Sequence, residues 1–366
     1  MRAAVLDAAG GDLHVENVPD PSPGPGEVLV KVSACGVCHT DLHVIKGEVA
    51  FPMPCVLGHE VAGTVAELGA GVQGPPVGAR VSSSFIMPCG TCKFCAQGRD
   101  DLCETFFALN RLRGTLYDGE TRLRRADGTP LWMYSMAGLA EYCVVPATDV
   151  FPLPEGIRLH ESAILGCAVF TAYGAVRNAA DLHPGETVAI VAVGGVGMNL
   201  VQVTRAFGAS RIIAVDIQDE KLEMARRLGA TDVVNSARDD AVKAVRELTG
   251  GVGVDVSFEA LGRAQTFVQA SEMLRDGGRM VAIGIAPGTT TAPIEITRLV
   301  RRSQRVIGSY GARTRMDMPA VLGLAARGVI RAEDVVTRTF ALDDVDAAYK
   351  ALAAGQIAGR AIVRVA

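Results

Sequence analysis

The sequence predicts an α/β protein in two parts, a β-rich part followed by a parallel, doubly wound sheet. The first 150 residues are rich in Gly and Pro and contain short apolar runs, such as 27–35 and 60–69, which is typical of β-structure. From Thr187 onward, strand-like and helix-like segments alternate, which is the pattern of a parallel sheet connected by helices. Six strand-like runs in this region predict a six-stranded sheet.

The individual elements follow from apolar periodicity. The strands of the parallel sheet are predicted at 187–193, 211–216, 232–235, 254–261, 279–286 and 305–310. Helices are predicted at 196–208 and 220–229, and after about Arg313 the pattern gives helices at 319–328 and 342–355 and a last strand at 360–365. The stretch 104–137 is polar and contains glycines, so it is expected to be a long surface loop.

The composition argues against several classes of function. Hydrophobic residues make up 49% and charged residues 21%, an ordinary globular composition, and a net charge of −4 predicts neither nucleic acid nor an anionic membrane as a partner. No apolar run reaches about 18 residues, and the first residues do not resemble a signal peptide. A cytoplasmic location is therefore expected, where nine cysteines would serve metal binding or catalysis.

Four of these cysteines lie close together, at Cys89, Cys92, Cys95 and Cys103. Four thiolates at this spacing suit a tetrahedral zinc ion, and neighbours two residues apart do not suit disulfide geometry. Four protein ligands leave no position for substrate, so this set predicts a closed, structural zinc site. The alternative is four free thiols in a flexible loop.

A glycine-rich turn follows the first strand of the parallel sheet and opens a helix. The turn contains Gly194, Gly195 and Gly197, and Ala192 stands where the G-x-G-x-x-G pattern has its first glycine. Asp216 ends the next strand, 19 residues past Gly197, where an acidic side chain accepts hydrogen bonds from both ribose hydroxyls. This pattern predicts a Rossmann domain that prefers NAD to NADP. Asp216 could instead close a turn or cap a helix, and Lys221 could contact the ribose or belong to a solvated helix face.

Cysteine and histidine also occur beside glycine at three distant points, as Cys38, His59 and Cys167. Three protein ligands with an open position are the pattern of a catalytic zinc. Separated ligands have no diagnostic spacing, however, and any one of them could be a core residue. Cys35, Cys55 and Cys143 are expected to fill core positions as small hydrophobic residues.

The chain resembles the zinc-dependent medium-chain alcohol dehydrogenases over nearly its whole length. The motifs that carry the resemblance are GVCHTDLH (36–43), GHE (58–60), the four-cysteine run, GCAVFTAYGA (166–175), the glycine-rich turn and Asp216. The resemblance implies a GroES-like catalytic domain at 1–168 and 309–366, with its structural zinc lobe at about 86–104. It places a Rossmann NAD-binding domain at 169–308.

The resemblance also implies roles for single residues. Cys38, His59 and Cys167 would bind the catalytic zinc, Glu60 would assist ligand exchange, and Asp41 would orient the His59 imidazole. Thr40 would pass the alcohol proton, by way of the cofactor ribose, to His43. The remaining cofactor contacts would be His39 and Arg360 at the pyrophosphate and Thr171 and Val196 at the nicotinamide.

The expected activity is reversible hydride transfer between primary or secondary alcohols and NAD, through a zinc alkoxide, giving aldehydes or ketones. Val49, Phe85, Trp132 and Tyr134 are expected to line an apolar substrate pocket. Val49 and Phe107 stand where the glutathione-dependent formaldehyde dehydrogenase branch needs polar or charged groups, which argues against that branch. A non-catalytic zinc- and nucleotide-binding scaffold is the alternative from another class. Relatives of this family are homodimers or homotetramers, and the sequence does not distinguish between the two.

Overall fold

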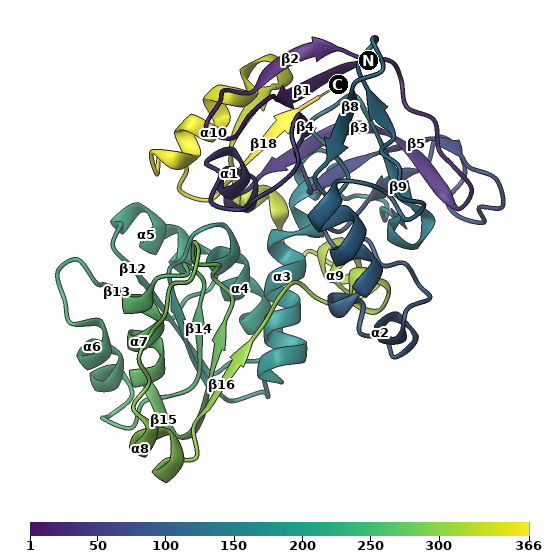
Figure 1. The fold of residues 1–366 in the computed structure, drawn as a ribbon. Helices are drawn as coiled ribbons and strands as arrows, with labels where there is room; N and C mark the ends of the chain where they lie inside the picture. The colour runs from purple at the N-terminus through teal and green to yellow at the C-terminus, as the bar shows by residue number, and fades with distance from the viewer. Residues whose placement is uncertain (366) are drawn as a thin grey trace. The chain divides into compact units, whose positions relative to one another are not determined.

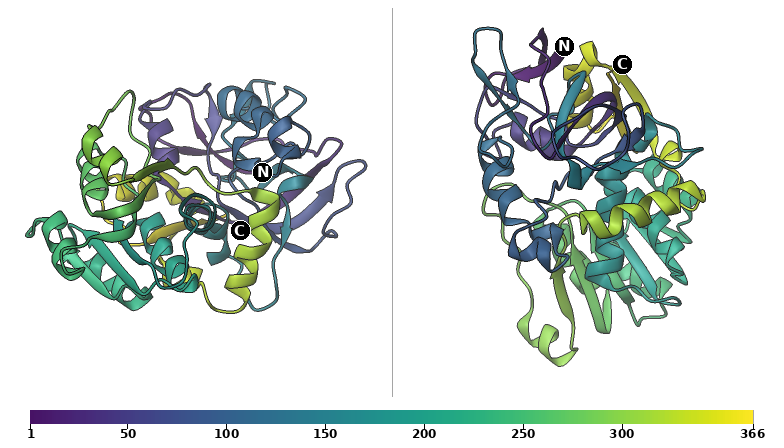
Figure 2. Two further views of the ribbon diagram at one scale, coloured as in Figure 1. Left: turned by 90° about the horizontal axis from the view of Figure 1, so that it is seen from below. Right: turned by 90° about the vertical axis from the view of Figure 1, so that its right-hand side faces the viewer.

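The computed structural model describes residues 1–365, which divide into two compact units. Unit 1 contains Met1–Phe170 together with the chain from Arg313 onward, and unit 2 contains Thr171–Ala312. In every view of Figures 1 and 2 the two ends of the chain lie near each other within unit 1. The predicted combination of a β-rich part with a six-stranded parallel sheet is confirmed.

Unit 1 is built on two β-sheets, one with the strand order β2-β1-β4-β8-β7 and one with the order β10-β6-β5-β3-β18-β17, in which β9 also pairs with β3. The strands are β1 (Arg2–Leu6), β2 (His14–Asn17), β3 (Glu27–Val37), β4 (Cys55–Val56), β5 (Val61–Leu68), β6 (Arg80–Ser82), β7 (Leu123–Arg124), β8 (Pro130–Met133), β9 (Tyr142–Pro146), β10 (Phe151–Pro152), β17 (Val336–Ala341) and β18 (Arg360–Arg364). Strand β18 pairs antiparallel with β3, with Val363 opposite Cys35. This pairing makes the last segment of the chain part of unit 1.

The helices of unit 1 are short except for α9, which has 13 residues. They are α1 (His39–Ile45), α2 (Lys93–Ala96), α9 (Thr314–Ala326) and α10 (Val345–Ala353), with a π-helix at Phe106–Arg111 and 3-10 turns at Asp100–Leu102, Ala147–Asp149, Glu161–Gly166, Ala332–Asp334 and Leu342–Asp344. Cys35, Cys55 and Cys143 are at most 1% exposed, so their predicted core positions are confirmed.

The prediction of a surface loop at 104–137 was wrong. The stretch contains the π-helix and strands β7 and β8, and Leu116, Leu123, Leu131 and Met133 are all at most 1% exposed. Strand β8 adds in parallel to β4, which hides its backbone in a sheet. The polar residues that suggested a loop have partners within the fold: Arg122 donates to the carboxylates of Glu27 and Asp118, and the buried Asn110 donates to the Ser135 carbonyl oxygen.

Unit 2 is a parallel sheet with the strand order β13-β12-β11-β14-β15-β16. The strands are β11 (Thr187–Val191), β12 (Arg211–Asp216), β13 (Asp232–Asn235), β14 (Val254–Glu259), β15 (Leu274–Ala282) and β16 (Arg305–Gly308). The helices are α3 (Ala168–Gly174, which begins in unit 1), a π-helix at Ala175–Ala180, α4 (Gly195–Ala206), α5 (Asp219–Leu228), α6 (Ala241–Leu248), α7 (Ala264–Glu272) and α8 (Ile296–Arg301). The order reverses beside β11, and in such sheets ligands bind at the carboxyl ends of the strands at this reversal.

One helical stretch, Glu161–Ala180, is long and apolar enough by composition to cross a membrane, among the residues the structure describes. Its most apolar window is 83% buried within the protein. Burial of this kind is what a core helix shows, and the apolar composition is explained by packing.

Candidate metal centres and nucleotide turn

The cysteine run forms a compact cluster at the surface of unit 1. The sulfurs of Cys89, Cys92, Cys95 and Cys103 all lie within 4.8 Å of one another. Thiolates about 2.3 Å from one zinc ion at tetrahedral angles would be about 3.8 Å apart, so the cluster has the dimensions of such a site. Cys95 and Cys103 are buried, whereas Cys89 and Cys92 are partly exposed.

Backbone amides support negative charge on these sulfurs. The N–H groups of Thr91 and Cys92 donate to Cys89 Sγ at 3.4 and 3.3 Å, and those of Cys89 and Phe106 donate to Cys103 Sγ at 3.3 and 3.4 Å. Although burial raises it, the pKa of the Cys89 thiol is lowered to about 6 by hydrogen bonds from the Thr105 side chain and from the N–H groups of Thr91 and Cys92, whereas burial raises the pKa of Cys103 to about 11. The residues present therefore fit a metal that needs thiolate ligands.

A single arginine ties the cysteine lobe to helix α9. Arg315 donates from Nη2 to the Cys95 carbonyl oxygen at 2.6 Å and to Asp100 Oδ1 at 2.7 Å, and its backbone N–H donates to Asp100 Oδ2 at 2.9 Å. Asp100 is fully buried. A buried carboxylate needs such a partner, so Arg315 fixes the lobe where it meets the rest of unit 1.

A second cluster lies in the interior of unit 1 and is assembled from three distant parts of the chain. One ligand atom from each of Cys38, His59, Glu60 and Cys167 lies within 4.8 Å of the others, and all four residues are buried. His59 Nε2 and Glu60 Oε2 are buried without a hydrogen-bond partner, which is costly unless a metal or a bound molecule completes them. Two thiols and an imidazole are a donor set typical of catalytic zinc, so the residues fit this ion.

Asp41 holds the imidazole of His59. Asp41 Oδ1 accepts from His59 Nδ1 at 3.0 Å and from the Gly58 backbone N–H at 3.3 Å, and Asp41 Oδ2 accepts from the Tyr349 hydroxyl at 2.8 Å. A carboxylate can only accept, so the proton lies on Nδ1, and the lone pair of Nε2 faces the cluster. The contact of Tyr349, on α10, was not predicted from the sequence, because nothing local connects it with Asp41.

Glycines explain how the cluster fits so close to the backbone. Gly58 has φ +99°, and a Cβ there would lie 2.6 Å from the Leu139 backbone nitrogen. At Gly36 a Cβ would lie 1.9 Å from Glu60 Oε2. A side chain at Gly36 would therefore displace Glu60, and one at Gly58, the residue before His59, would collide with the backbone of Leu139.

The thiols of Cys38 and Cys167 are close enough to form a hydrogen bond. The hydrogen bond between them lowers the pKa of Cys38 and raises that of Cys167. Burial raises the pKa of Glu60 to about 7, against the effect of the Arg360 guanidinium. Arg360 is 5% exposed, and its Nη2 donates to Glu60 Oε1. The structure thus places the predicted pyrophosphate cation beside the carboxylate of the metal cluster.

The predicted proton-relay residues both lie on α1, which begins directly after Cys38. Cys38 Sγ donates to Thr40 Oγ1 at 3.6 Å, and Thr40 is half-buried. His43 is in the last turn, and its Nδ1 is 2.5 Å from Glu48 Oε2. His39 is exposed at the first position of the same helix.

Two of the four predicted pocket residues contact the metal cluster. The rings of Phe85 and Tyr134 lie edge-on to His59, with centroids 6.0 and 6.2 Å from the imidazole centroid. Both side chains are buried, at 6% and 0% exposure. Val49 and Trp132 are half-buried; Val49 follows the turn after α1, and Trp132 lies in β8 opposite Cys55.

The glycine-rich turn of unit 2 follows β11 and opens α4. Ala192, in place of the usual glycine, has φ +72°, a conformation that favours glycine. A Cβ at Gly197 would lie 2.1 Å from the Ala192 carbonyl oxygen, whereas a Cβ at Gly194 meets nothing within 4 Å. Gly197 is therefore required by helix–strand packing, and Gly194 leaves open space next to the backbone at the helix N-terminus. Gly195 and Val196, in the first turn of α4, are half-buried.

Asp216 closes the strand-end turn at this site. Its Oδ2 accepts from the Val193 N–H at 3.0 Å, and its Oδ1 accepts from the N–H groups of Ile217 and Gln218 at 2.8 and 3.1 Å. A carboxylate has about four acceptor sites, so capacity remains for a ligand hydroxyl. Lys221 is half-buried on α5, and Thr171 is 8% exposed in α3.

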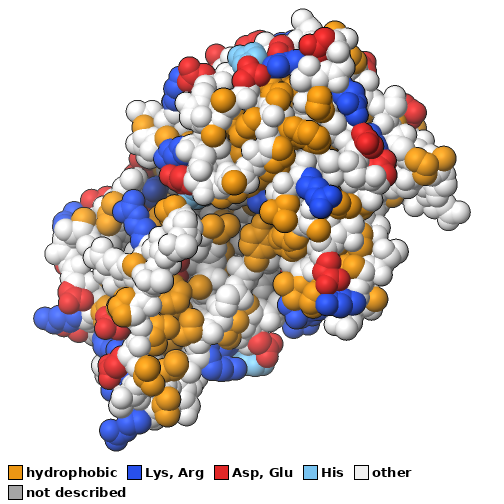
Figure 3. All heavy atoms as spheres, viewed as in Figure 1, with side chains coloured by type: hydrophobic (Ala, Val, Ile, Leu, Met, Phe, Trp, Pro, Cys, Tyr) orange, Lys and Arg blue, Asp and Glu red, His pale blue; other side chains and the backbone are white. Residues whose placement is uncertain are grey.

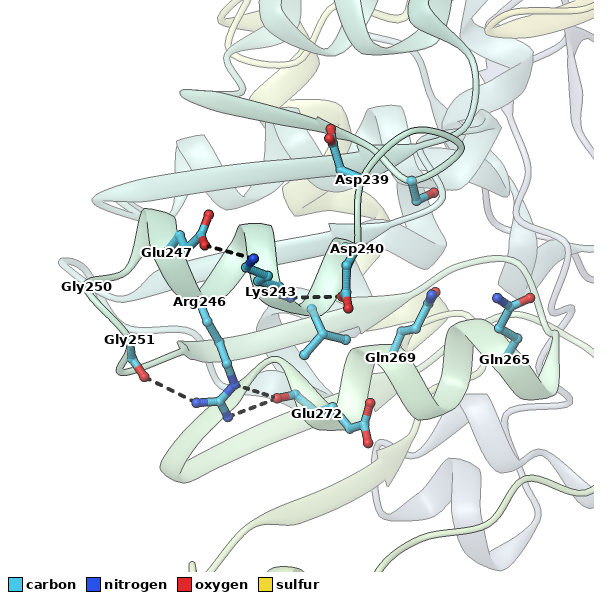
Figure 4. A pocket seen from close by; sticks show the side chains of 13 residues that line it. Asp239, Asp240, Lys243, Arg246, Glu247, Gly250, Gly251, Gln265, Gln269 and Glu272 are labelled. Atoms are coloured by element: carbon cyan, nitrogen blue, oxygen red, sulfur yellow. Dashed lines mark hydrogen bonds and ion pairs between the residues drawn. The ribbon is translucent and has the colours of Figure 1, made fainter.

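A hollow that is separate from both metal clusters lies between α6 and α7 of unit 2. It has a volume of about 990 Å³ and contains none of the predicted site residues. Its polar side chains bond to neighbours in the same wall: Lys243 lies 3.9 Å from Glu247, and Arg246 donates to the carbonyl oxygens of Gly251 and Glu272 (Figure 4). Such groups are already satisfied, so the hollow is a solvated surface between helices.

Comparison with known proteins agrees with this geometry. The family models "Alcohol dehydrogenase GroES-like domain" and "Zinc-binding dehydrogenase" match residues 24–155 and 195–327. An alcohol dehydrogenase of Geobacillus stearothermophilus is 36% identical over 368 residues, which cover 100% of both chains. The chain belongs to the zinc-binding medium-chain alcohol dehydrogenase family.

Two further family members show the range of activities among the relatives. An S-(hydroxymethyl)glutathione dehydrogenase of Escherichia coli is 35% identical over 364 residues, which cover 97% of each chain. The crystal structure of benzyl alcohol dehydrogenase from Acinetobacter calcoaceticus matches with a TM-score of 0.93 and 29% identity, covering 100% of this chain and 99% of that one. The chain is thus an oxidoreductase of a family that acts on CH–OH groups.

Proposed function

We propose that this protein is an NAD-dependent zinc alcohol dehydrogenase that interconverts primary or secondary alcohols with aldehydes or ketones. The observation that carries the proposal is the buried cluster of Cys38, His59, Glu60 and Cys167, in which His59 Nε2 has no protein partner. A closed four-cysteine set elsewhere in the same unit accounts for a second, structural zinc.

The chain's own residues prepare this centre for catalysis. Zinc, when bound, would supply a Lewis acid that lowers the pKa of an alcohol hydroxyl. Asp41 keeps the His59 lone pair directed at the cluster, and the rings of Phe85 and Tyr134 limit access of water beside the imidazole. Thr40 would accept the alcohol proton, and His43 would deliver it to solvent.

Asp216 supports NAD as the cofactor. A carboxylate at this strand end accepts hydrogen bonds from ribose hydroxyls and repels a 2′-phosphate. Glycine-rich backbone at Gly194–Gly197 would receive the pyrophosphate, with Lys221 near the ribose. His39 and Arg360 as pyrophosphate cations, and Thr171 and Val196 beside the nicotinamide, remain predictions.

The substrate is proposed to be an apolar alcohol. The two buried aromatic rings at the cluster favour an apolar substituent on the reacting carbon. Phe107, in place of a charged group, argues against the activity of the E. coli relative. A benzylic alcohol is a suitable first substrate, because a flat aromatic ring can pack edge-on against the ring of Phe85.

The test is a metal count combined with a coupled assay. Two zinc ions per chain are expected, with alcohol-dependent reduction of NAD at a higher kcat/KM than of NADP. Benzyl alcohol, short aliphatic alcohols and formaldehyde with glutathione form the panel. One zinc per chain with no turnover would instead support a non-catalytic scaffold, and preferred turnover of the glutathione adduct would overturn the substrate assignment.

A matched pair of cysteine variants distinguishes loss of a zinc ligand from general destabilisation of the fold. Cys167→Ala is expected to abolish turnover and remove one zinc. Cys143→Ala removes another buried thiol, one that belongs to neither cluster, and it should keep both zinc ions and activity.

We also propose that the protein is a cytoplasmic homo-oligomer. Strand β16 is an edge of the parallel sheet, and Ile285, Ile296, Val300 and Val306 expose large apolar side chains near it, at 36–75% exposure. Figure 3 shows hydrophobic side chains gathered on the lower part of unit 2 in this view. Sedimentation of the wild-type protein and of Val300→Glu tests this point, since the charged side chain should weaken association.

A further inference from the structure

We propose that Glu48 positions the imidazole of His43 so that Nε2 is the nitrogen that accepts the proton. The inference rests on the proposed dehydrogenase function, and it assigns a role to a residue that no motif identified. Glu48 would act through His43 and would not itself contact the substrate.

The turn after α1 brings the two side chains together. Gly47 has φ +73°, and the chain then reverses so that the backbone N–H groups of Glu48 and Val49 donate to the His43 carbonyl oxygen at 2.9 and 3.2 Å. This helix ending returns the next residue to the last helical turn. As a result, Glu48 Oε2 lies 2.5 Å from His43 Nδ1.

The chemistry of a carboxylate decides which ring nitrogen carries the proton. The side chains of His43 and Glu48 are 22% and 34% exposed, so both reach solvent without being fully hydrated. The hydrogen bond from His43, with a smaller effect of Lys46, lowers the pKa of Glu48, which keeps it an acceptor. Nδ1 must then be the donor, and the Nε2 lone pair is left free to take a proton.

The pair of Asp41 and His59 shows the same arrangement of carboxylate and imidazole. Asp41 accepts from Nδ1 of His59 at 3.0 Å and leaves Nε2 for the metal cluster. Glu48 accepts from Nδ1 of His43 and leaves Nε2 for a proton. Asp41 and Glu48, three and ten residues after Cys38, thus each orient one imidazole. His59 serves the buried centre, and His43 lies near the surface.

The proton balance is simple. His43 takes one proton at Nε2 and becomes an imidazolium, whose charge is offset by the Glu48 carboxylate beside it. Loss of that proton from Nε2 to water restores the neutral ring with Nδ1–H still bonded to Glu48. No oxidation or reduction is involved.

The first experiment observes the tautomer directly in the purified protein without cofactor or substrate. The chain has six histidines, so their ring nitrogens can be resolved by 15N NMR after histidine-specific labelling. His43→Gln assigns the His43 signals by their disappearance. The neutral His43 ring is expected to carry its proton on Nδ1 in the wild type and to shift toward Nε2–H in Glu48→Ala.

The second experiment measures turnover. Glu48→Ala is expected to lower kcat for alcohol oxidation about tenfold with KM changed less than twofold, and Glu48→Asp should restore part of it. The kcat of Glu48→Gln should lie between those of the wild type and Glu48→Ala, because the glutamine amide can present either an acceptor or a donor to His43 Nδ1. In the His43→Gln background, Glu48→Ala should cause no further loss.

Asp181→Asn is the matched control. Asp181 Oδ2 lies 3.6 Å from His183 Nε2 in an exposed pair on unit 2, and asparagine tolerates its φ of +49°. This variant should keep wild-type kcat and an unchanged His43 signal.

Three results would overturn the inference: an Nε2–H tautomer in the wild type, an unchanged tautomer in Glu48→Ala, or a loss of kcat from Glu48→Ala that persists without His43. Absence of alcohol turnover in the wild type would contradict the proposed function alone, since the NMR measurement still decides whether Glu48 orients His43.

Discussion

The two cysteine clusters of unit 1 are built in opposite ways. The four-cysteine set comes from one run of fifteen residues and lies partly exposed at the surface. The set with Cys38, His59 and Cys167 is gathered from three points that span more than a hundred residues, and every member is buried. A local set is visible in the sequence and complete in itself, whereas a dispersed set exists only when the whole unit has folded.

The largest effect on activity is expected from a variant that removes a ligand of the buried cluster. Cys38→Ala should lower kcat/KM for alcohol oxidation at least about a thousandfold, because loss of the Lewis acid removes several kcal/mol of transition-state stabilisation. Zinc analysis should show one ion lost and one kept. The reciprocal variant, Cys95→Ala, should lose the other ion and lower the thermal midpoint. If Cys95→Ala abolished turnover while leaving the thermal midpoint unchanged, the division of roles would be wrong.

The next largest effect is expected at Asp41, which hydrogen-bonds the His59 imidazole of the buried cluster. Asp41→Asn should weaken zinc retention or activity by about 10- to 100-fold, because the amide no longer holds His59 in the Nδ1–H tautomer through a charged acceptor. Chelator-competition titrations and kcat/KM measure the two effects. The internal control is the thiolate-to-cobalt charge-transfer absorption of the four-cysteine site after cobalt substitution, which should not change.

A third variant tests what holds the exposed cluster in place. Arg315→Ala should destabilise the cysteine lobe by about 1–3 kcal/mol, because it leaves the buried Asp100 carboxylate without its partner. Zinc release from the lobe and limited proteolysis measure the loosening. Lys93→Ala is the control: its ion pair with Glu104 is exposed on both sides and should contribute less than about 0.5 kcal/mol. Equal effects of both variants would contradict the anchoring role of Arg315.

The smallest effect is expected at Tyr349, which hydrogen-bonds Asp41. Tyr349→Phe removes the hydroxyl that donates to Asp41 Oδ2 and should lower kcat/KM only a few-fold, at a cost of about 1 kcal/mol. Combined with Asp41→Asn, it should add less than it does alone, since both act on the same carboxylate. Full additivity would show that Tyr349 does not act through Asp41.

The alternating pattern from Thr187 was enough to predict the parallel sheet, because each strand is a short apolar run and each helix shows its own period. The stretch 104–137 was misjudged because its polar residues find partners inside the fold, such as Glu27 for Arg122, and because strand β8 gains its place only by pairing with β4. Neither the partner strand nor the buried side of such a segment is visible in its local composition.

By itself, the sequence determined the residue types at both metal clusters, the strand–turn–helix of the nucleotide region and the four-cysteine set, since these depend on chemistry and on neighbours in the chain. Only the tertiary structure decided that Tyr349 supports Asp41, that Arg360 lies against Glu60, and that Glu48 turns back to His43. The first two contacts join residues about 300 positions apart, and the third depends on the backbone reversal at Gly47. The physical reason is that a hydrogen bond is set by distance and direction in space, which the chain acquires only when its sheets and helix ends have formed.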